Sequence, residues 1–289
     1  MSDSAGNLPS VVAVLGAGPV DPATPVVRAD DAGVTRGDGC FEGCRVRTDQ
    51  HGVSSVDKLD AHLARMARSA AALELPFDEP AWRALVDTAT GAWSRPGEAA
   101  MKLLLTRGAP GGAPTGFAQI TPLPAHYPRQ RRDGLRIITL DRGYASTSFR
   151  DAPWLLGGVK TLSYAVNMAA AREAERRGVD DVLFVTSDGY VLEAPTASVV
   201  WSAGRTLHTT PTGDTGILAG TTQQLLFAKA RAAGWQTAER LATVDELHAA
   251  EVVWLVGSVR GAVDVVELDG KPRARLPEVD AEIRALAGF

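Results

Sequence analysis

One lysine in this chain stands where its amine, rather than its charge, could be used. Lys160 follows the apolar, glycine-bearing run PWLLGGV and precedes a stretch without a charged residue before Arg172. Removing water from an ammonium group lowers its pKa, and the positive end of a helix starting there would lower it further. A lysine held partly as free amine can form a Schiff base. The alternative is a lysine that snorkels into water from a helix start.

The other lysines are set in different surroundings. Lys58 opens an amphipathic helix, Lys229 lies on a helix face, and Lys271 follows an Asp-Gly turn, so we expect water to solvate all three. Lys102 falls near the end of an expected strand. Because the chain otherwise uses arginine, which does not deprotonate at useful pH, Lys160 is the candidate nucleophile.

A second candidate is the stretch GDTGILAGTTQQLLF, residues 213–227. A glycine-bearing turn leads into a helix whose first turn carries Thr221 and Thr222, so unpaired backbone amides and two hydroxyls point to one place. Such a helix start accepts a phosphate group. Ordinary threonine capping is the alternative. The Gly-Lys-Ser/Thr ending of a Walker motif is absent.

The third candidate is Glu193, in the apolar stretch YVLEAPTASVVW. A carboxylate in such a strand is costly unless it meets a cation or a hydrogen-bond donor, and the alternative is an edge strand facing water. A reactive amine, a phosphate cradle and a buried carboxylate together are what pyridoxal phosphate (PLP) requires. The amine binds its aldehyde, the cradle its phosphate, and the acid keeps its ring nitrogen protonated.

Composition narrows the classes of partner. The chain has 289 residues, 45% hydrophobic and 22% charged, with a net charge of −4 and a pI near 5.8. We therefore expect no nucleic-acid or membrane partner. The start MSDSAGNLPS lacks a signal-peptide pattern and no run is long enough to span a bilayer, which predicts a cytoplasmic protein. Five scattered histidines and the spacing of Cys40 and Cys44 give no support to a metal site, and free buried thiols are expected.

Periodicity divides the chain into α/β segments. Short strands and a glycine-rich stretch, 35–43, precede helices expected over 58–75 and 80–93 and strands at 101–108 and 116–123. Residues 122–134 are rich in Pro and Arg without a period and are interpreted as an interdomain linker. Beyond it we expect a strand at 135–140, a helix over 160–177, paired strands around Asp188-Gly189, a helix over 221–233 and further strands. Two α/β domains result, 1–121 and 135–289.

Six ordered stretches resemble one family. DAGVTRGDGCFEGCRV, LDAHLARM, MKLLLTRG, GVKTLSYAVN, EAPTASVVW and GILAGTTQQ, between residues 31 and 270, are similar to the fold-type IV PLP enzymes, which include branched-chain and D-amino-acid aminotransferases and aminodeoxychorismate lyases. The resemblance implies an α/β (α+β) fold with a smaller N-terminal and a larger C-terminal domain. It implies Lys160 as the Schiff-base lysine, Glu193 at the ring nitrogen, Leu218 against the ring, and Arg65, Thr221 and Thr222 at the phosphate. It also implies a homodimer.

The chain departs from the family pattern at two places. Thr196, Ala197 and Ser198 stand where the family usually has Thr-Ser-Asn, and Gln223 stands where its aminotransferases often carry Arg. RGDGCFEGCRV, KLLLTRGAPGG and PAHYPRQRRDG resemble the lyase branch. The favoured function is therefore cleavage of 4-amino-4-deoxychorismate to 4-aminobenzoate and pyruvate for folate biosynthesis, although Ala113, Pro114 and Thr115 replace the Arg-containing turn frequent in that branch.

Two alternatives remain open at this level. An aminotransferase acting on D-amino acids or branched-chain amino acids would use the same lysine, and a dual activity is compatible with shared cofactor contacts. A PLP-binding scaffold without activity conflicts with the intact amine and carboxylate. The small-molecule substrate carries carboxylates, and the candidates to hold them are Arg107, Arg36 and Ser258.

Overall fold

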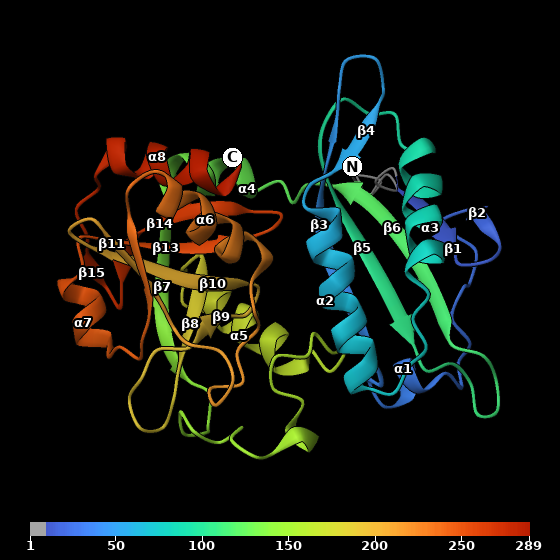
Figure 1. Cartoon of the computed structure of the whole chain (residues 1–289), viewed down its shortest axis with the longest axis horizontal. Coiled ribbons are helices and arrows are strands. Elements are labelled where there is room, and N and C mark those ends of the chain that lie inside the picture. The colour runs from blue at the N-terminus through green and yellow to red at the C-terminus, as the bar shows by residue number, and fades with distance from the viewer. Residues whose placement is uncertain (1–9) are drawn as a thin grey trace, which may run out of the picture. The chain divides into compact units, whose positions relative to one another are not determined.

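The computed structural model describes residues 10–289, which form two compact units (Figure 1). The first unit comprises the chain up to Pro124 together with Val159–Ser163, and the second comprises Ala125–Gly158 and Tyr164–Phe289. Most of the stretch without a signal-peptide pattern, residues 1–9, lies outside the described residues. The mixed α/β fold class predicted from the sequence is confirmed.

The first unit is built on a six-stranded antiparallel sheet. Its strand order is β2 (Gly18–Val20), β1 (Val11–Val14), β6 (Thr115–Pro122), β5 (Gly97–Thr106), β3 (Gly39–Thr48), β4 (Ser54–Val56). Three helices accompany it: α1 (Ala32–Thr35), α2 (Leu59–Ala72) and α3 (Glu79–Gly91). The expected helices and strands of this half are present. The glycine-rich stretch, expected to break the strands, instead runs into the ten-residue strand β3.

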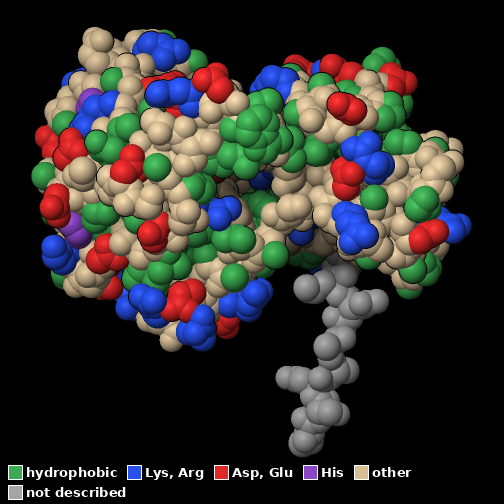
Figure 2. Space-filling model, turned by 90° about the horizontal axis from the view of Figure 1, so that it is seen from below, with side chains coloured by type: hydrophobic (Ala, Val, Ile, Leu, Met, Phe, Trp, Pro, Cys, Tyr) green, Lys and Arg blue, Asp and Glu red, His purple; other side chains and the backbone are tan. Residues whose placement is uncertain are grey.

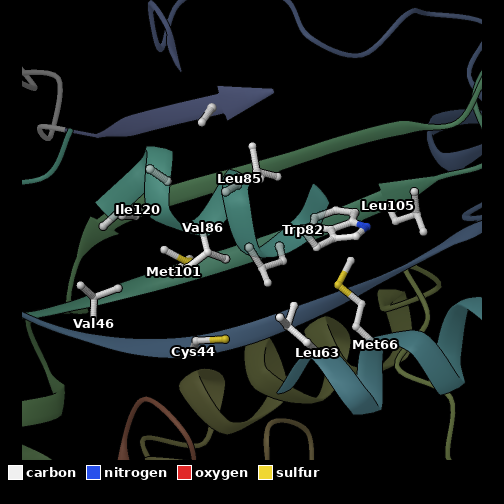
Figure 3. Packing of buried hydrophobic residues seen from close by; sticks show 14 of the residues in the cluster. Cys44, Val46, Leu63, Met66, Trp82, Leu85, Val86, Met101, Leu105 and Ile120 are labelled. Atoms are coloured by element: carbon white, nitrogen blue, oxygen red, sulfur yellow. The ribbon is translucent and has the colours of Figure 1, made fainter. Parts of the chain in front are cut away.

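One face of this sheet is covered by α2 and α3. Alternate strand residues such as Cys44 and Met101 pack there against Leu63 and Met66 of α2 and Trp82 of α3, as Figure 3 shows, and all five are at most 1% exposed. Because side chains alternate across a strand, their sequence neighbours point to the opposite face. Phe41, Gly43 and Lys102 therefore share the face that carries no core contact.

A segment from later in the chain extends this sheet at its β3 edge. β4 pairs only with the far end of β3, so the backbone of Gly39–Phe41 is left at an edge. Val159–Ser163 takes that place: Thr161 forms an antiparallel bridge with Cys40. The helix expected over 160–177 therefore begins only at Ala165, because edge pairing holds the residues before it extended.

The second unit contains a nine-stranded mixed sheet. Its main order is β12 (Gln236–Glu239), β11 (Thr206–Thr209), β10 (Ala197–Ala203), β13 (Val252–Gly257), β14 (Gly261–Leu268), β7 (Leu135–Asp141), β8 (Asp181–Val185), with β9 (Glu193–Ala194) paired to β10 and β15 (Lys271–Pro272) to β14. Its helices are α4 (Tyr127–Asp133), the short 3-10 helix η1 (Pro153–Leu155), α5 (Ala165–Arg176), α6 (Thr221–Ala232), α7 (Val244–Ala249) and α8 (Pro277–Ala287).

Both faces of this second sheet are covered. Val199 and Trp201 of β10 pack in one buried cluster, whereas Val200 between them packs in another with Leu226 of α6 and Ile283 of α8. A strand buried on both faces needs a continuous apolar run rather than alternation. This explains why VVWLVG and SVVW lack a polar face.

The Pro- and Arg-rich stretch 122–134 is not irregular, in contrast to the expectation for a linker. It contains helix α4, with a proline in its first turn and Gly134 (φ +84°) after its end. Proline is tolerated in a first helical turn because the N–H groups there have no intrahelical partner. The first unit ends at Pro124, so this helix belongs to the second unit.

The face of the molecule in Figure 2 carries charges of both signs. On the face in Figure 2, Lys and Arg side chains are interspersed with Asp and Glu. Among the described residues, no helix has both the length and the apolar composition needed to cross a membrane.

Candidate active site

Lys160 is presented by the added edge segment of the first unit. Its carbonyl accepts the N–H of Phe41 at 3.0 Å, its own N–H donates to Ser69 Oγ at 3.2 Å, and Leu162 N–H donates to the carbonyl of Gly39 at 2.9 Å. Its Nζ lies 4.4 Å from the centroid of the Phe41 ring. The backbone is therefore fixed and the half-buried amine lies against an aromatic face. The expected help from a helix start is wrong, since α5 begins five residues later.

The face that carries Phe41 also carries a cation that the sequence analysis set aside. Lys102 pairs directly with Gly43, two residues from Phe41 on the same face. It is exposed, and a Cβ placed on Gly43 would meet nothing within 4 Å. The space over Gly43 lies beside the Lys102 ammonium group and near the Phe41 ring that the Lys160 amine contacts. Such a position suits a substrate carboxylate. Only the cross-strand register, which the sequence does not give, places these residues together.

Arg65 lies in a buried charge cluster of the same unit. Its Nε and Nη2 donate to the two oxygens of Glu42 at 2.7 and 2.8 Å, and His62 Nδ1 contacts Glu42 Oε2 at 2.7 Å. Burial alone would raise the pKa of Glu42, but the hydrogen bonds from Arg65 and His62 and their charges lower it to about 2. Burial lowers the pKa of His62. A neutral imidazole then donates through Nδ1–H, and Arg65 has a fixed position with a compensated charge.

The same cluster brings three metal-ligand residue types together. Donor atoms of Glu42, Cys44 and His62 lie within 4.8 Å of one another, all buried. However, both oxygens of Glu42 already accept hydrogen bonds from Arg65 and His62. A guanidinium at that position opposes a second cation, so we assign the cluster to orienting Arg65. Burial, and secondarily the negative charge of Glu42, raises the pKa of the Cys40 thiol to about 12. Both cysteines are buried free thiols, as expected.

Three hydroxyl groups meet at the start of α6 in the second unit. Ser258 Oγ lies 3.0 Å from Thr221 Oγ1 and 3.1 Å from Thr222 Oγ1, and we call these three residues the anion cradle. Gly220 precedes the helix without a side-chain cap, so the first-turn amides are left for a ligand. A Cβ on Gly220 would be 2.4 Å from Ser198 Oγ, so a side chain there would have to displace that hydroxyl. Ser258, expected to hold substrate, instead lies with the threonines.

Glu193 is held by the loop that precedes α6. Its Oε1 accepts the N–H of Leu218 at 3.2 Å, which provides a donor for the carboxylate, as its apolar surroundings require. Asn167 Nδ2 donates to the carbonyl of Pro195 at 2.8 Å, and the Tyr164 hydroxyl donates to the same oxygen. Burial, together with the negative charge of Glu193, raises the pKa of Tyr164 to about 12, with Asn167 opposing the shift. Tyr164 and Asn167 thus position the Glu193 stretch, a role the sequence alone did not assign.

The two arginines predicted to hold substrate differ in their surroundings. Arg107 donates to Asp38 and, through Nη2, to the carbonyl of Leu73 at 2.6 Å, and the Asp38 carboxylate raises the pKa of Arg107. Two of its three guanidinium nitrogens, Nε and Nη2, are therefore used within the first unit. Arg36 is exposed at the end of α1, and its side chain makes no hydrogen bond or ion pair to any residue between 10 and 289. Of the two, Arg36 is better placed to meet a ligand.

Comparison with known proteins identifies the family of the chain. The family described as amino-transferase class IV matches residues 39–268. The chain belongs to this family. A bifunctional aminodeoxychorismate lyase / D-amino acid transaminase of Mycobacterium tuberculosis is 42% identical over 276 residues, 91% of this chain and 94% of that protein. The resemblance to fold-type IV PLP enzymes is thereby confirmed.

Solved structures of class IV relatives share the fold. The PLP-bound form of a hypothetical aminotransferase from Mycobacterium tuberculosis has a TM-score of 0.90 and 43% identity, covering 96% of this chain and 98% of that chain. A hypothetical aminotransferase from the same organism with α-ketoglutarate and PMP bound has a TM-score of 0.90 and 42% identity with the same coverage. Among class IV proteins, therefore, relatives with nearly the whole fold of this chain bind this cofactor.

Proposed function

We propose that the protein is a PLP-dependent 4-amino-4-deoxychorismate lyase that releases pyruvate and forms 4-aminobenzoate, with D-amino-acid transamination as a second activity. The observation that carries the proposal is the fixed presentation of the Lys160 amine beside Phe41 on an open sheet face. The bifunctional relative, similar over 91% of the chain, supports the pairing of the two activities.

The residues present fit the cofactor. We assign Lys160 to its aldehyde carbon, Glu193 to its ring nitrogen, Leu218 to its ring face, and Arg65, Thr221 and Thr222 to its phosphate, and we add Ser258 to the phosphate group because of its contacts with both threonines. These groups match the cofactor chemically. Neutral hydroxyls and free helix amides donate to an anionic phosphate, and a carboxylate accepts from a protonated ring nitrogen. When bound, PLP stores the electron pair left on a substrate carbon after its proton is removed.

Lys160 and Glu193 have different roles in proton transfer. Lys160 removes the proton from the substrate carbon that bears nitrogen, and in the lyase reaction it returns a proton to the departing pyruvate. Glu193 holds the proton at the ring nitrogen. In transamination the same amine delivers the proton to the cofactor side instead. Both reactions therefore depend on the same lysine and the same carboxylate.

Substrate recognition distinguishes the two activities. The lyase substrate carries two carboxylates and a D-amino acid such as D-alanine carries one. We propose Lys102 and Arg36 as carboxylate ligands, since both are exposed cations of the first unit. Arg107, whose Nε and Nη2 donate to Asp38 and Leu73, is proposed as a support for the strand end rather than as a substrate ligand.

A paired assay tests this proposal. The PLP-loaded protein is given aminodeoxychorismate, with 4-aminobenzoate measured, and separately D-alanine with α-ketoglutarate, with pyruvate measured. We expect both products, and Lys160→Ala should lose both as well as the borohydride-stable attachment of the cofactor seen by mass spectrometry. Lys102→Met should raise the lyase KM more than Lys271→Met, an exposed lysine after a turn. Formation of neither product would reject the proposal. Pyruvate from D-alanine without 4-aminobenzoate from aminodeoxychorismate would make transamination the main activity.

We further propose a homodimer in the cytoplasm that binds only small-molecule substrates. Exposed apolar side chains of the second unit, including Trp154 (75%), Val166 (49%) and Met168 (48%), support a contact with another copy. Two cysteines without a disulfide suit a reducing compartment. Sedimentation of the purified protein measures the mass directly, and a monomer at micromolar concentration would reject the dimer.

A further inference from the structure

The turn that carries Ser258 is held by helix α4, which lies outside the anion cradle. This turn, residues 257–261, joins β13 to β14 and is called the Ser258 turn below. Arg131 of α4 reaches it with two parallel hydrogen bonds: Nε donates to the carbonyl of Arg260 at 2.8 Å and Nη2 to the carbonyl of Val259 at 2.7 Å. A planar guanidinium bound at two points fixes orientation as well as distance.

Two further contacts fix the same turn. Arg260 forms an ion pair with Asp181 at 2.6 Å, and both side chains are below 10% exposed. The Phe289 ring lies below the Arg131 guanidinium at 5.2 Å, and a Cβ on Gly261 (φ +96°) would be 2.8 Å from that ring. The backbone of the turn is therefore held on its carbonyl side by Arg131 and packed closely at its end.

The neighbouring arginines of α4 make contacts of another kind. Arg132 pairs with Asp133, and its side chain is 71% exposed. Arg129 pairs with Asp180 and is 51% exposed. The Arg132–Asp133 pair is exposed on both sides, and such pairs contribute little to stability, whereas Asp180, the partner of Arg129, is only 10% exposed. Arg131 differs because it donates to two backbone carbonyls of a distant loop, 128 and 129 residues along the chain.

We propose that Arg131 is a positioning residue for the anion cradle, which acts by holding the Ser258 turn so that the Ser258 hydroxyl stays within reach of Thr221 and Thr222. Without the two bonds, only the Arg260–Asp181 pair and the packing at Gly261 would hold the turn, so Ser258 would sample more conformations, and ordering it on binding would cost entropy. The inference rests on the proposed function, since it takes the anion to be the phosphate of PLP. It also gives a role to the Arg-rich block PRQRRD, which the proposed chemistry does not use.

The test compares two cofactor forms in full-length protein freed of cofactor. Dissociation constants for PLP and for pyridoxal, which lacks the phosphate, are measured for wild type, Arg131→Met and Arg132→Met. We expect Arg131→Met to raise the Kd of PLP roughly five- to tenfold, less than the loss of a whole hydrogen bond to a charged group because the Ser258 hydroxyl is retained, with little change for pyridoxal. Arg132→Met should change neither value. Equal weakening of both ligands would show a merely structural role and overturn the inference.

Ser258→Ala and the double variant Arg131→Met/Ser258→Ala test the route of action. If Arg131 acts through Ser258, the double variant should have the same ratio of PLP to pyridoxal Kd as Ser258→Ala alone. Additive losses would overturn the inference. If Arg131→Met fails to fold, Arg131→Lys, which keeps the charge but cannot donate in parallel to two carbonyls, replaces it with the same expected shift. Failure of wild type to attach PLP at Lys160 would reject the proposed function instead.

Discussion

Arg65 and the anion cradle are the two regions that we propose for phosphate binding, and they use different chemistry. Arg65 lies in the middle of α2, where every backbone amide is used within the helix, so only a side chain can bind an anion there. That side chain is charged, buried and paired with Glu42. The cradle lies at the start of α6, where amides are unsatisfied, and neutral hydroxyls are sufficient.

The difference affects how each region is supported. A buried charge must be compensated, so the Arg65 region depends on Glu42 and His62 and responds to pH. Neutral hydroxyls need only correct placement, so the cradle depends on the geometry of the Ser258 turn. We therefore expect loss of one group near Arg65 to damage folding, and loss of one hydroxyl in the cradle to damage only cofactor affinity.

The largest effect is expected for Glu42→Gln. This change leaves the Arg65 guanidinium buried without a counter-charge, and breaking a buried pair costs about 3–5 kcal/mol of unfolding free energy. Urea unfolding measures the loss. Glu98→Gln is the matched control, because Glu98 also pairs with an arginine but is 27% exposed, and Arg45 keeps Asp57 as a second partner. A loss below about 1 kcal/mol for Glu42→Gln would contradict the view that Arg65 is a buried charge.

The second effect concerns cofactor affinity rather than folding. In Glu42→Gln/Arg65→Met both charges are removed, so the comparison with Glu42→Gln alone isolates the contribution of the guanidinium to the phosphate. Hydrogen bonds to charged groups contribute about 1.5–3 kcal/mol, which predicts a PLP Kd roughly 10- to 150-fold higher. Pyridoxal binding should change little. An unchanged PLP Kd would mean that Arg65 serves only the core of the first unit.

These two regions also differ in how far the sequence could predict them. Thr221 and Thr222 were found because helix-start chemistry is local, and α6 begins at Thr221 as expected. Ser258 could be assigned only to a turn, since its contact with the threonines spans 36 residues or more. Glu42 and His62 gave no signal, because their pairing depends on α2 packing against β3.

Two local errors have physical explanations. The stretch before α5 has helix-compatible residues, but pairing with the β3 edge overrides that preference and places Lys160 in an extended segment. The Pro- and Arg-rich stretch carried a usable signal for α4, a proline in the first turn followed by polar residues and Gly134. Its short length, seven residues, concealed the helical period.

The pH response provides a third, smaller test of the charged region. Because burial lowers the pKa of His62, the unfolded chain binds a proton below about pH 6.5 that the folded protein does not, and stability falls as pH drops. The slope is at most about 1.4 kcal/mol per pH unit. The lowered pKa of Glu42, about 2, adds a further loss below about pH 4.5.

Urea unfolding at pH 7.5 and 5.5 measures this response. His62→Asn, which does not titrate and keeps an N–H donor, should reduce the difference between the two pH values relative to wild type. His51→Asn, at an exposed position, should leave it unchanged. If both variants follow wild type, His62 is not the group responsible.

The smallest effect is expected in the cradle. Thr222→Val keeps the volume of a side chain that is 1% exposed but removes the hydroxyl; because the other two hydroxyls and the helix amides still bind the anion, we expect only the cost of a typical hydrogen bond, about 0.5–1.5 kcal/mol. The PLP Kd should rise roughly two- to tenfold, while the pyridoxal Kd and the urea midpoint change little. Thr88→Val, at a half-buried helix position where the hydroxyl donates only to the Ala84 carbonyl of the same helix, controls for the substitution itself. A loss of stability as large as that of Glu42→Gln, without a change in affinity, would mean that the Thr222 hydroxyl is a capping group of α6 and that the two regions do not share one anion.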